Sequence, residues 1–350
     1  MFNASWSLQP DSRLAAMDLV RHQPFAASAR WGMLFASGFH QPQWLFSEVR
    51  RLLGDKPLFG GSCCGIITPA GVDYGGFEAL LLLFDSPCDS LCLPQQDQQG
   101  LLNWIGNDHA LCFFDLLGSP VRDLFDSARH QQLQGAALLG DFGLRTSFMF
   151  CGDKVANDCL LAIKLPAPTT MAVSHGAIPI SDPLTITAGQ GGLVQSLDGQ
   201  PALDCLLALL GQDEAKLRGS LLHQLSLGQP WNNTYSSHMI AKLDSQSRSL
   251  HLGTGQFETG QKVVLMSRSV DSTWQDTRMQ LAAFGKDKPS FYINCAGRTA
   301  AFSGALQEES ELVRQYLGRE MAGIFSGAEL ASLNGQPRLM NWTGVLMQWS

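Results

Sequence analysis

About sixty residues at the end of this 350-residue chain repeat, in looser form, a segment near its start. The early copy comprises residues 33–38, 48–54, 61–67 and 79–84, and the late copy comprises residues 291–297, 311–318, 323–329 and 344–349. These landmarks keep nearly the same order and spacing in both copies. A repeated unit indicates an architecture before any single motif is interpreted.

Each copy is predicted to run strand, helix, strand, turn, strand. In the early copy, strand 33–36 precedes a helix at 44–53, which has apolar residues at Leu45, Val49 and Leu52 and ends before Gly54. A strand at 58–64, a turn at 68–71 and a strand at 77–84 follow. A weaker third copy lies between the other two, with strands at 111–115, 135–140 and 158–165 and a helix at 121–131.

The three copies predict an α/β protein in which repeated strand-helix-strand modules form mixed sheets covered by helices, in two composite domains. Residues 166–168 (Pro-Ala-Pro) mark a joint. The segment 166–288 is predicted to be a meander of strands with one helical excursion. It includes strands at 239–243, 249–253 and 261–267 and a helix that opens at 198–202.

Composition limits the classes of partner. The formal net charge is −7 and no run of Lys or Arg occurs, which argues against binding to nucleic acid. The longest apolar runs are far shorter than the roughly 20 residues that cross a bilayer, and residues 1–5 do not begin a signal peptide. The nine cysteines include no CxxC pair, so free buried thiols in a reducing, cytoplasmic compartment are expected.

Several short segments together resemble one known family. Residues 294–298 (Asn-Cys-Ala-Gly-Arg) resemble a C-x-G-R segment, 323–330 (Gly-Ile-Phe-Ser-Gly-Ala-Glu-Leu) a glycine- and glutamate-containing segment, and 341–343 (Asn-Trp-Thr) a closing N-x-T segment. Further matches lie at 61–65, 174–179 and 197–202. In this order and spacing the segments resemble the FIST (F-box and intracellular signal transduction) family, from about residue 30 to the end.

The resemblance implies a FIST N-terminal module at 25–205, with units at 30–85 and 108–165 plus the joint, and a FIST C-terminal module at 206–350, with the third unit at 289–350. It implies a cytosolic sensory protein in bacterial signal transduction that binds an amino acid or another small carboxylate. A separate histidine kinase is the implied partner, and a homodimer is left open. A subset of similar proteins bind haem and sense nitric oxide, which is the alternative function.

Arg298 is the foremost candidate for binding a ligand, together with Asn294, Cys295 and Glu329. A guanidinium at this strand-to-loop corner can bind a carboxylate with two parallel hydrogen bonds, or it can form an ion pair with Glu329. Cys295 is either a small buried residue beneath the arginine or a thiolate activated by it. The second reading predicts a thiol-dependent enzyme, but no histidine lies nearby in sequence and no catalytic constellation is visible, so a non-enzyme is expected.

The eight histidines form no HxH, HExxH or CxxCH motif, so no metal site and no covalently attached haem are predicted. Haem held by one axial histidine needs no local motif. His175 lies at the joint, and His238 follows Trp231 and Tyr235 in an aromatic neighbourhood. These two are therefore the candidate ligands should haem be bound, and ordinary hydrogen-bonded histidines otherwise.

Overall fold

Three copies of one strand-helix-strand unit build most of the fold. The computed structural model describes residues 2–21, 23–121, 132–166, 168–333 and 335–349. In the first unit, β2 (Trp31–Ala36) lies parallel to β3 (Leu58–Ser62) and antiparallel to β6 (Ala79–Phe84), and α2 (Pro42–Leu53) connects the parallel pair. The predicted order of elements in the early copy is therefore confirmed.

The other two units have the same arrangement. The second contains β8 (His109–Asp115), β9 (Gln132–Leu138) and β12 (Cys159–Lys164), and the third contains β23 (Ser290–Cys295), α9 (Glu309–Leu317), β24 (Met321–Ser326) and β27 (Gly344–Gln348). The helix predicted at 121–131 lies almost wholly outside the described residues. The shared pattern of parallel and antiparallel pairing confirms the threefold repeat.

Each unit begins earlier than its predicted copy, with one more strand and helix. The extra strand pairs antiparallel with the last strand of the unit, so it extends the sheet at that edge. These elements are β1 (Phe2–Ser7) with α1 (Ser12–Arg21), β7 (Ser90–Pro94) with α3 (Gln98–Ile105), and β13 (Thr170–Ser174) with α7 (Val270–Leu281).

The three units also exchange strands in a cycle. Before its last strand, each unit sends a hairpin to the sheet of another unit, which produces three six-stranded sheets. The first unit's hairpin joins β24, the second unit's joins β3 and the third unit's joins β9. The hairpins are β4 (Gly65–Thr68) with β5 (Gly71–Asp73), β10 (Met149–Gly152) with β11 (Lys154–Ala156), and β25 (Ala328–Leu333) with β26 (Gln336–Met340).

The segment predicted as a meander closes into a barrel, which is inserted into the third unit between β13 and α7. Antiparallel pairing runs β22–β18–β19–β20–β16–β15, and β15 pairs back to β22, so six strands close. The predicted division at 205/206 falls within α5. The elements here are β14 (Ala177–Pro179), β15 (Leu184–Gly191), β16 (Leu193–Leu197), β17 (Gln200–Pro201), α5 (Ala202–Leu210), α6 (Glu214–Lys216), η1 (Leu217–Leu221), η2 (Leu222–Gln224), β18 (Leu225–Trp231), β19 (Thr234–Asp244), β20 (Ser249–Leu252), β21 (Phe257–Glu258) and β22 (Lys262–Arg268).

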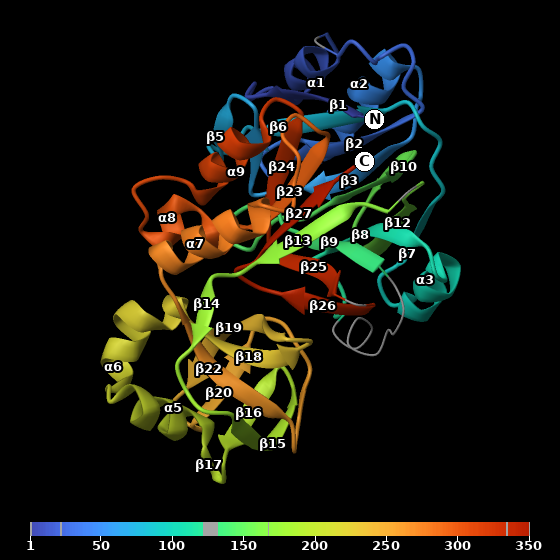
Figure 1. Cartoon of the computed structure of the whole chain (residues 1–350). Helices are drawn as coiled ribbons and strands as arrows, with labels where there is room; N and C mark the ends of the chain where they lie inside the picture. The colour runs from blue at the N-terminus through green and yellow to red at the C-terminus, as the bar shows by residue number, and fades with distance from the viewer. Residues whose placement is uncertain (1, 22, 122–131, 167, 334, 350) are drawn as a thin grey trace.

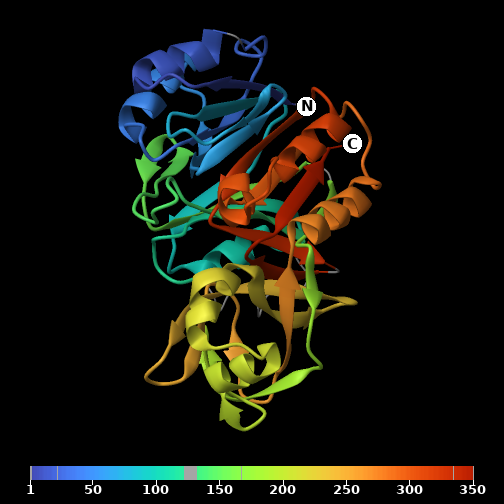
Figure 2. The same cartoon turned by 90° about the vertical axis from the view of Figure 1, so that its left-hand side faces the viewer.

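The sheets and helices form distinct layers. The inner faces of the three sheets meet in a central core, where the ring of Phe35 lies 5.5 Å from that of Phe113 and 5.7 Å from that of Phe291. Helices α1 and α2, α3, and α7 with α9 cover the outer faces. The barrel has its own core and forms a separate lobe beside this three-sheet body (Figures 1 and 2). The α/β class with mixed sheets in two domains is thereby confirmed.

None of the described helices is both long enough and apolar enough to cross a membrane.

Candidate ligand-binding site at the junction of body and barrel

The three C-terminal segments that carry the family resemblance form one surface. The backbone N–H of Cys295 donates to the carbonyl of Thr343 (3.0 Å), and the N–H of Thr343 donates to the carboxyl group of Glu329 (3.3 Å). A Cβ atom at Gly297 would lie 2.8 Å from the Trp342 ring, so only glycine lets the two segments approach this closely. The segments are consequently adjacent in space although they are spread over fifty residues of sequence.

The Arg298 side chain is buried beneath this surface and is not exposed at its edge. It ends the short helix η3 (Ala296–Arg298), is 2% exposed, and donates to the carbonyl and the hydroxyl of Ser174 (2.9 Å to Oγ) and to Thr277 Oγ1 (3.1 Å). It also forms an ion pair with Glu309 (3.1 Å). Although burial opposes its charge, Glu309 holds the pKa of Arg298 above its usual range. Arg298 therefore links β13, α7 and α9.

Of the two alternatives for Arg298, the ion pair with Glu329 is wrong, because the carboxylate partner is Glu309. Glu329 is fully buried and accepts hydrogen bonds from Ser326 Oγ (2.8 Å) and the Thr343 N–H. Burial raises the pKa of Glu329 to about 8, and the hydrogen bonds oppose that rise only in part. Its carboxyl group is thus mostly protonated at neutral pH and does not serve as a counter-charge.

The other two predicted residues lie in the same buried network. Asn294 donates from Nδ2 to Glu309 (3.1 Å) and to Ser310 Oγ (2.9 Å), so it orients the carboxylate that holds Arg298. Cys295 is 4% exposed, and burial, with the neighbouring Glu329, raises the pKa of its thiol to about 12. The thiol is therefore protonated at neutral pH, which does not suit a nucleophile.

This environment makes Cys295 a poor target for alkylation. At pH 7.5 we expect iodoacetamide to modify Cys295 no faster than Cys88, which is half-buried and lies away from the site. The rates are measured by peptide mass spectrometry at a series of reaction times. Preferential modification of Cys295 would instead support the alternative of a thiol-dependent enzyme.

His238 does not fit as an axial haem ligand. Its side chain is fully buried, and burial lowers its pKa to about 3. Nε2 lies 2.8 Å from Ser236 Oγ. Nδ1 lies 3.0 Å from Thr254 Oγ1, which itself donates to Asn341 Oδ1. Both ring nitrogens are therefore engaged by hydroxyl groups, and no lone pair is open to an iron.

His175 does not fit that role either. Its Nδ1 accepts the backbone N–H of Ala177 (3.0 Å), so the ring proton of the neutral form resides on Nε2. An axial ligand needs the opposite arrangement, with the Nε2 lone pair free and Nδ1 protonated. Burial lowers the pKa of His175, although Asp276, whose carboxylate accepts the N–H groups of His175 and Gly176, opposes that change.

A cavity of about 390 Å³ lies between the body and the barrel, directly over the surface formed by the family segments. We call it the junction cavity. Its volume falls in the range of small-molecule sites. Leu144 and Phe302 line it and are also largely exposed, which gives the cavity an apolar rim. The lining residues are Leu139, Phe142, Leu144, Arg218, Leu222, His223, Met239, Ile240, Ala241, Arg268, Cys295, Ala296, Gly297, Phe302, Gly327 and Trp342.

Arg268, the last residue of β22, separates the junction cavity from a smaller cavity of about 140 Å³ that reaches Arg298 and Glu309. Its guanidinium lies over the Trp342 ring (4.1 Å to the centroid) and donates to the carbonyl of Gly297 (2.9 Å) and, from Nε and Nη2, to the carbonyl of His223 (3.4 and 3.3 Å). Burial lowers the pKa of Arg268 to about 10, so the side chain is still cationic at neutral pH. Among the described residues, no carboxylate lies within ion-pairing distance of Arg268 and no acceptor bonds to its Nη1.

Sequence reasoning named neither Arg268 nor Glu309. The predicted strand at 261–267 ended one residue before Arg268, and a cation after an apolar run was the signal that could have identified it. Glu309 follows another glutamate at the start of a helix, a pattern that is typical of a solvated helix end. Its burial depends on the tertiary contacts with Arg298, Tyr292 and Asn294.

Comparison with known proteins places these features in a family. A model of the FIST N domain matches residues 30–200, and a model of the FIST C domain matches residues 202–332. Two uncharacterized proteins of Mycobacterium tuberculosis, from strains CDC 1551 and H37Rv, are each 23% identical over 213 residues. The matched region is 57% of this chain and 55% of each relative, so the chain spans about half the length of these curated relatives.

Proposed function

The chain belongs to the FIST family of signal-transduction sensory domains, and we propose that it senses a small carboxylate, such as an amino acid, in the junction cavity. The observation that carries this proposal is the state of Arg268. A cationic side chain that is 7% exposed and lacks a carboxylate partner among the described residues is costly unless an anion joins it. A ligand carboxylate at Nη1 would supply that anion through charge-assisted hydrogen bonds.

The rest of the site supports the same class of ligand. The cation–π contact with Trp342 and the bond to Gly297 hold the guanidinium plane in place before any ligand binds. The apolar walls, which include Phe142 and Ile240, suit a ligand with an apolar part beside its carboxylate. We therefore expect apolar amino acids or small acids with an apolar tail to bind best.

In this proposal Arg298 is a positioning residue. Its terminal nitrogens are bonded to Ser174, Thr277 and Glu309, and it fixes the η3 corner whose Gly297 carbonyl orients Arg268. Cys295 contributes to the floor of the cavity, and Glu329 and Asn294 lie beneath it. A ligand that contacts both β22 and η3 would favour one arrangement of barrel and body, which a separate partner such as a histidine kinase can detect.

Arg268→Gln should weaken binding of the best ligand by about 10–100-fold, because it removes charge-assisted hydrogen bonds to the carboxylate. The ligand is found by thermal shift across a panel of amino acids and small carboxylic acids, and affinities follow from calorimetry. The amide analogue of that ligand should bind the wild type as weakly as the acid binds Arg268→Gln. The same variant should remove any effect of the ligand on phosphorylation of a partner kinase.

Arg218→Gln is the matched control. Arg218 also lines the junction cavity, but it is already paired with Glu214 (2.7 Å), so its loss should change ligand affinity little. The proposal fails if no compound of the panel binds, or if Arg268→Gln and Arg218→Gln have equal effects. Melting of both variants without ligand separates a loss of binding from a loss of folding.

A further inference from the structure

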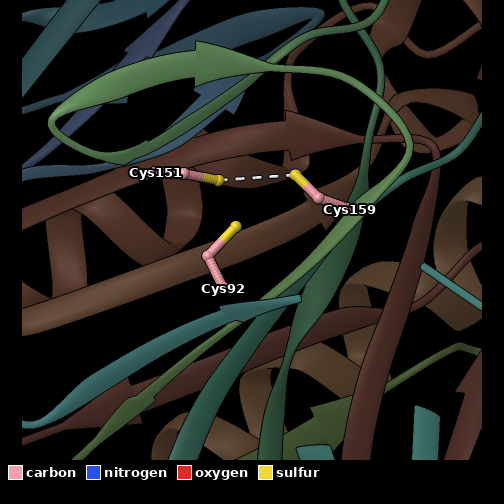
Figure 3. Close-up of side chains that lie close together, drawn as sticks. All are labelled: Cys92, Cys151 and Cys159. Atoms are coloured by element: carbon pink, nitrogen blue, oxygen red, sulfur yellow. Dashed lines mark hydrogen bonds between the residues drawn. The ribbon is translucent and has the colours of Figure 1, made fainter. Parts of the chain in front are cut away.

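Three cysteines from three strands meet where two sheets of the body approach each other. The Sγ atoms of Cys92, Cys151 and Cys159 all lie within 4.8 Å of one another, and those of Cys151 and Cys159 are 3.4 Å apart (Figure 3). Cys92 is on β7 and Cys159 is on β12, which are neighbours in one sheet. Cys151 is on β10, which belongs to the sheet of β3.

The spacing of the sulfur atoms suits one shared metal ion. With metal–sulfur bonds of about 2.3 Å, three thiolates around one ion lie about 4.0 Å apart in a trigonal arrangement and about 3.8 Å apart in a tetrahedral one. Separations between 3.4 and 4.8 Å therefore need only small side-chain rotations to reach either geometry. A disulfide would require the two closest sulfurs to approach to about 2.05 Å and would leave the third thiol unused.

The repeated scaffold does not require thiols at these positions. Phe113, Phe35 and Ile293 face the central core and pair with Leu161, Leu80 and Val345. Two residues before these partners, Cys159 therefore aligns with Glu78 in the first unit and with Thr343 in the third. Both of those residues are buried, so glutamate or threonine occupies the equivalent position in the same fold. The fold thus does not by itself require a cysteine at the position of Cys159.

We propose that Cys92, Cys151 and Cys159 bind one thiophilic d10 metal ion, zinc(II) or copper(I). Thiolate ligands select these ions over harder cations. Each thiol gives up its proton to solvent when the metal–sulfur bond forms, and no electron is transferred. No further Cys, His, Asp or Glu of the described chain belongs to the cluster, so copper(I) would be three-coordinate and zinc(II) would take a water as its fourth ligand.

The site has an entry route and a structural consequence. Cys151 and Cys159 are buried, whereas Cys92 is only partly buried, so an ion would reach the cluster from the side of Cys92. A bound ion would connect the β7–β12 edge of one sheet to the hairpin β10–β11 of the other. It would therefore stabilise the strand exchange between the first two units, and none of the three cysteines lines the junction cavity.

The test uses the reduced full chain, kept free of oxygen and titrated with zinc(II) or copper(I) in competition with a chromophoric chelator of each metal. The wild type should bind one equivalent of one of these ions, release protons on binding and melt at a higher temperature with the ion than without it. Cys92→Ser should weaken binding at least about 10-fold. Cys88→Ser, a change at a half-buried cysteine of the same segment, should leave affinity unchanged.

Cys159→Ala provides a second variant, which removes a buried thiol of the cluster without adding a polar group, and it should also lose binding. Melting without metal shows whether each variant is folded, and Cys92→Ser decides the question if Cys159→Ala is not. The proposal is overturned if neither ion binds the wild type more tightly than it binds Cys92→Ser. It is equally overturned if protein purified with excess zinc carries no zinc and its mass is lower by two hydrogens, as formation of a Cys151–Cys159 disulfide requires.

Discussion

Replacing Arg298 by alanine should lower the free energy of unfolding by about 3–5 kcal/mol, the usual cost of breaking a buried ion pair from one side. The Glu309 carboxylate is 3% exposed and would keep only its bonds from Tyr292 (3.1 Å) and Asn294 (3.1 Å). The carbonyl of Ser174 would lose the Arg298 donor in the same step, and the hydroxyl of Ser174 would keep only its contact with Thr277 Oγ1 (2.9 Å). Urea unfolding with an unchanged m-value would report this loss as a lower midpoint.

Two further variants separate the ion pair from simple packing. In Arg298→Met combined with Glu309→Gln both charges are absent, so the double variant should be more stable than the sum of the single effects predicts. Arg51→Ala removes the arginine of an exposed pair with Glu48 on α2 and should leave the midpoint within experimental error. A loss for Arg298→Ala no larger than that for Arg51→Ala would show that the pair is solvated.

The contrast between Arg298 and Arg268 explains why the sequence pointed to the candidate site but not to Arg268, the proposed binding group. The short segments around Cys295, Gly327 and Trp342 were visible as motifs, and they do line the junction cavity. Arg298 is already bonded by protein groups because α7, α9 and β13 pack around η3. Those contacts join residues up to 124 positions apart, so no local pattern records them.

The features of the fold likewise fall into two groups, those that local sequence predicts and those that depend on distant contacts. Apolar strands and the glycine-rich turns of each unit are local signals, and they predicted the repeat. The exchange of hairpins was not predictable, because β25 pairs with β9 through residues such as Ala328 and Ala137, which are far apart in the chain. Barrel closure depends on two residue pairs between β15 and β22, which no local pattern predicts. The three cysteines of the second unit have no characteristic spacing, so their meeting was not predictable either.

Replacing Glu329 by glutamine should remove a large part of the pH dependence of stability between about pH 4.5 and 8. In the folded chain burial raises the pKa of Glu329 to about 8, while in the unfolded chain the group titrates near 4.5. Between these values the folded state holds a proton that the unfolded state has released, so stability falls as pH rises. Below about pH 4.5 both states are protonated and the group adds no such dependence.

Glutamine reproduces the neutral side chain and can still accept from Ser326 and Thr343, so the variant should match the wild type near pH 5. Near pH 8 it should be more stable than the wild type by about 2–4 kcal/mol, because each pH unit in the window is worth up to about 1.4 kcal/mol. Thermal unfolding at pH 5, 6.5 and 8 measures the difference. Glu320→Gln, at an exposed carboxylate of the third unit, serves as the control. Parallel pH curves for the wild type and Glu329→Gln would mean that Glu329 is ionised in the fold, where Arg298 and Arg268 would be the cations that stabilise its charge.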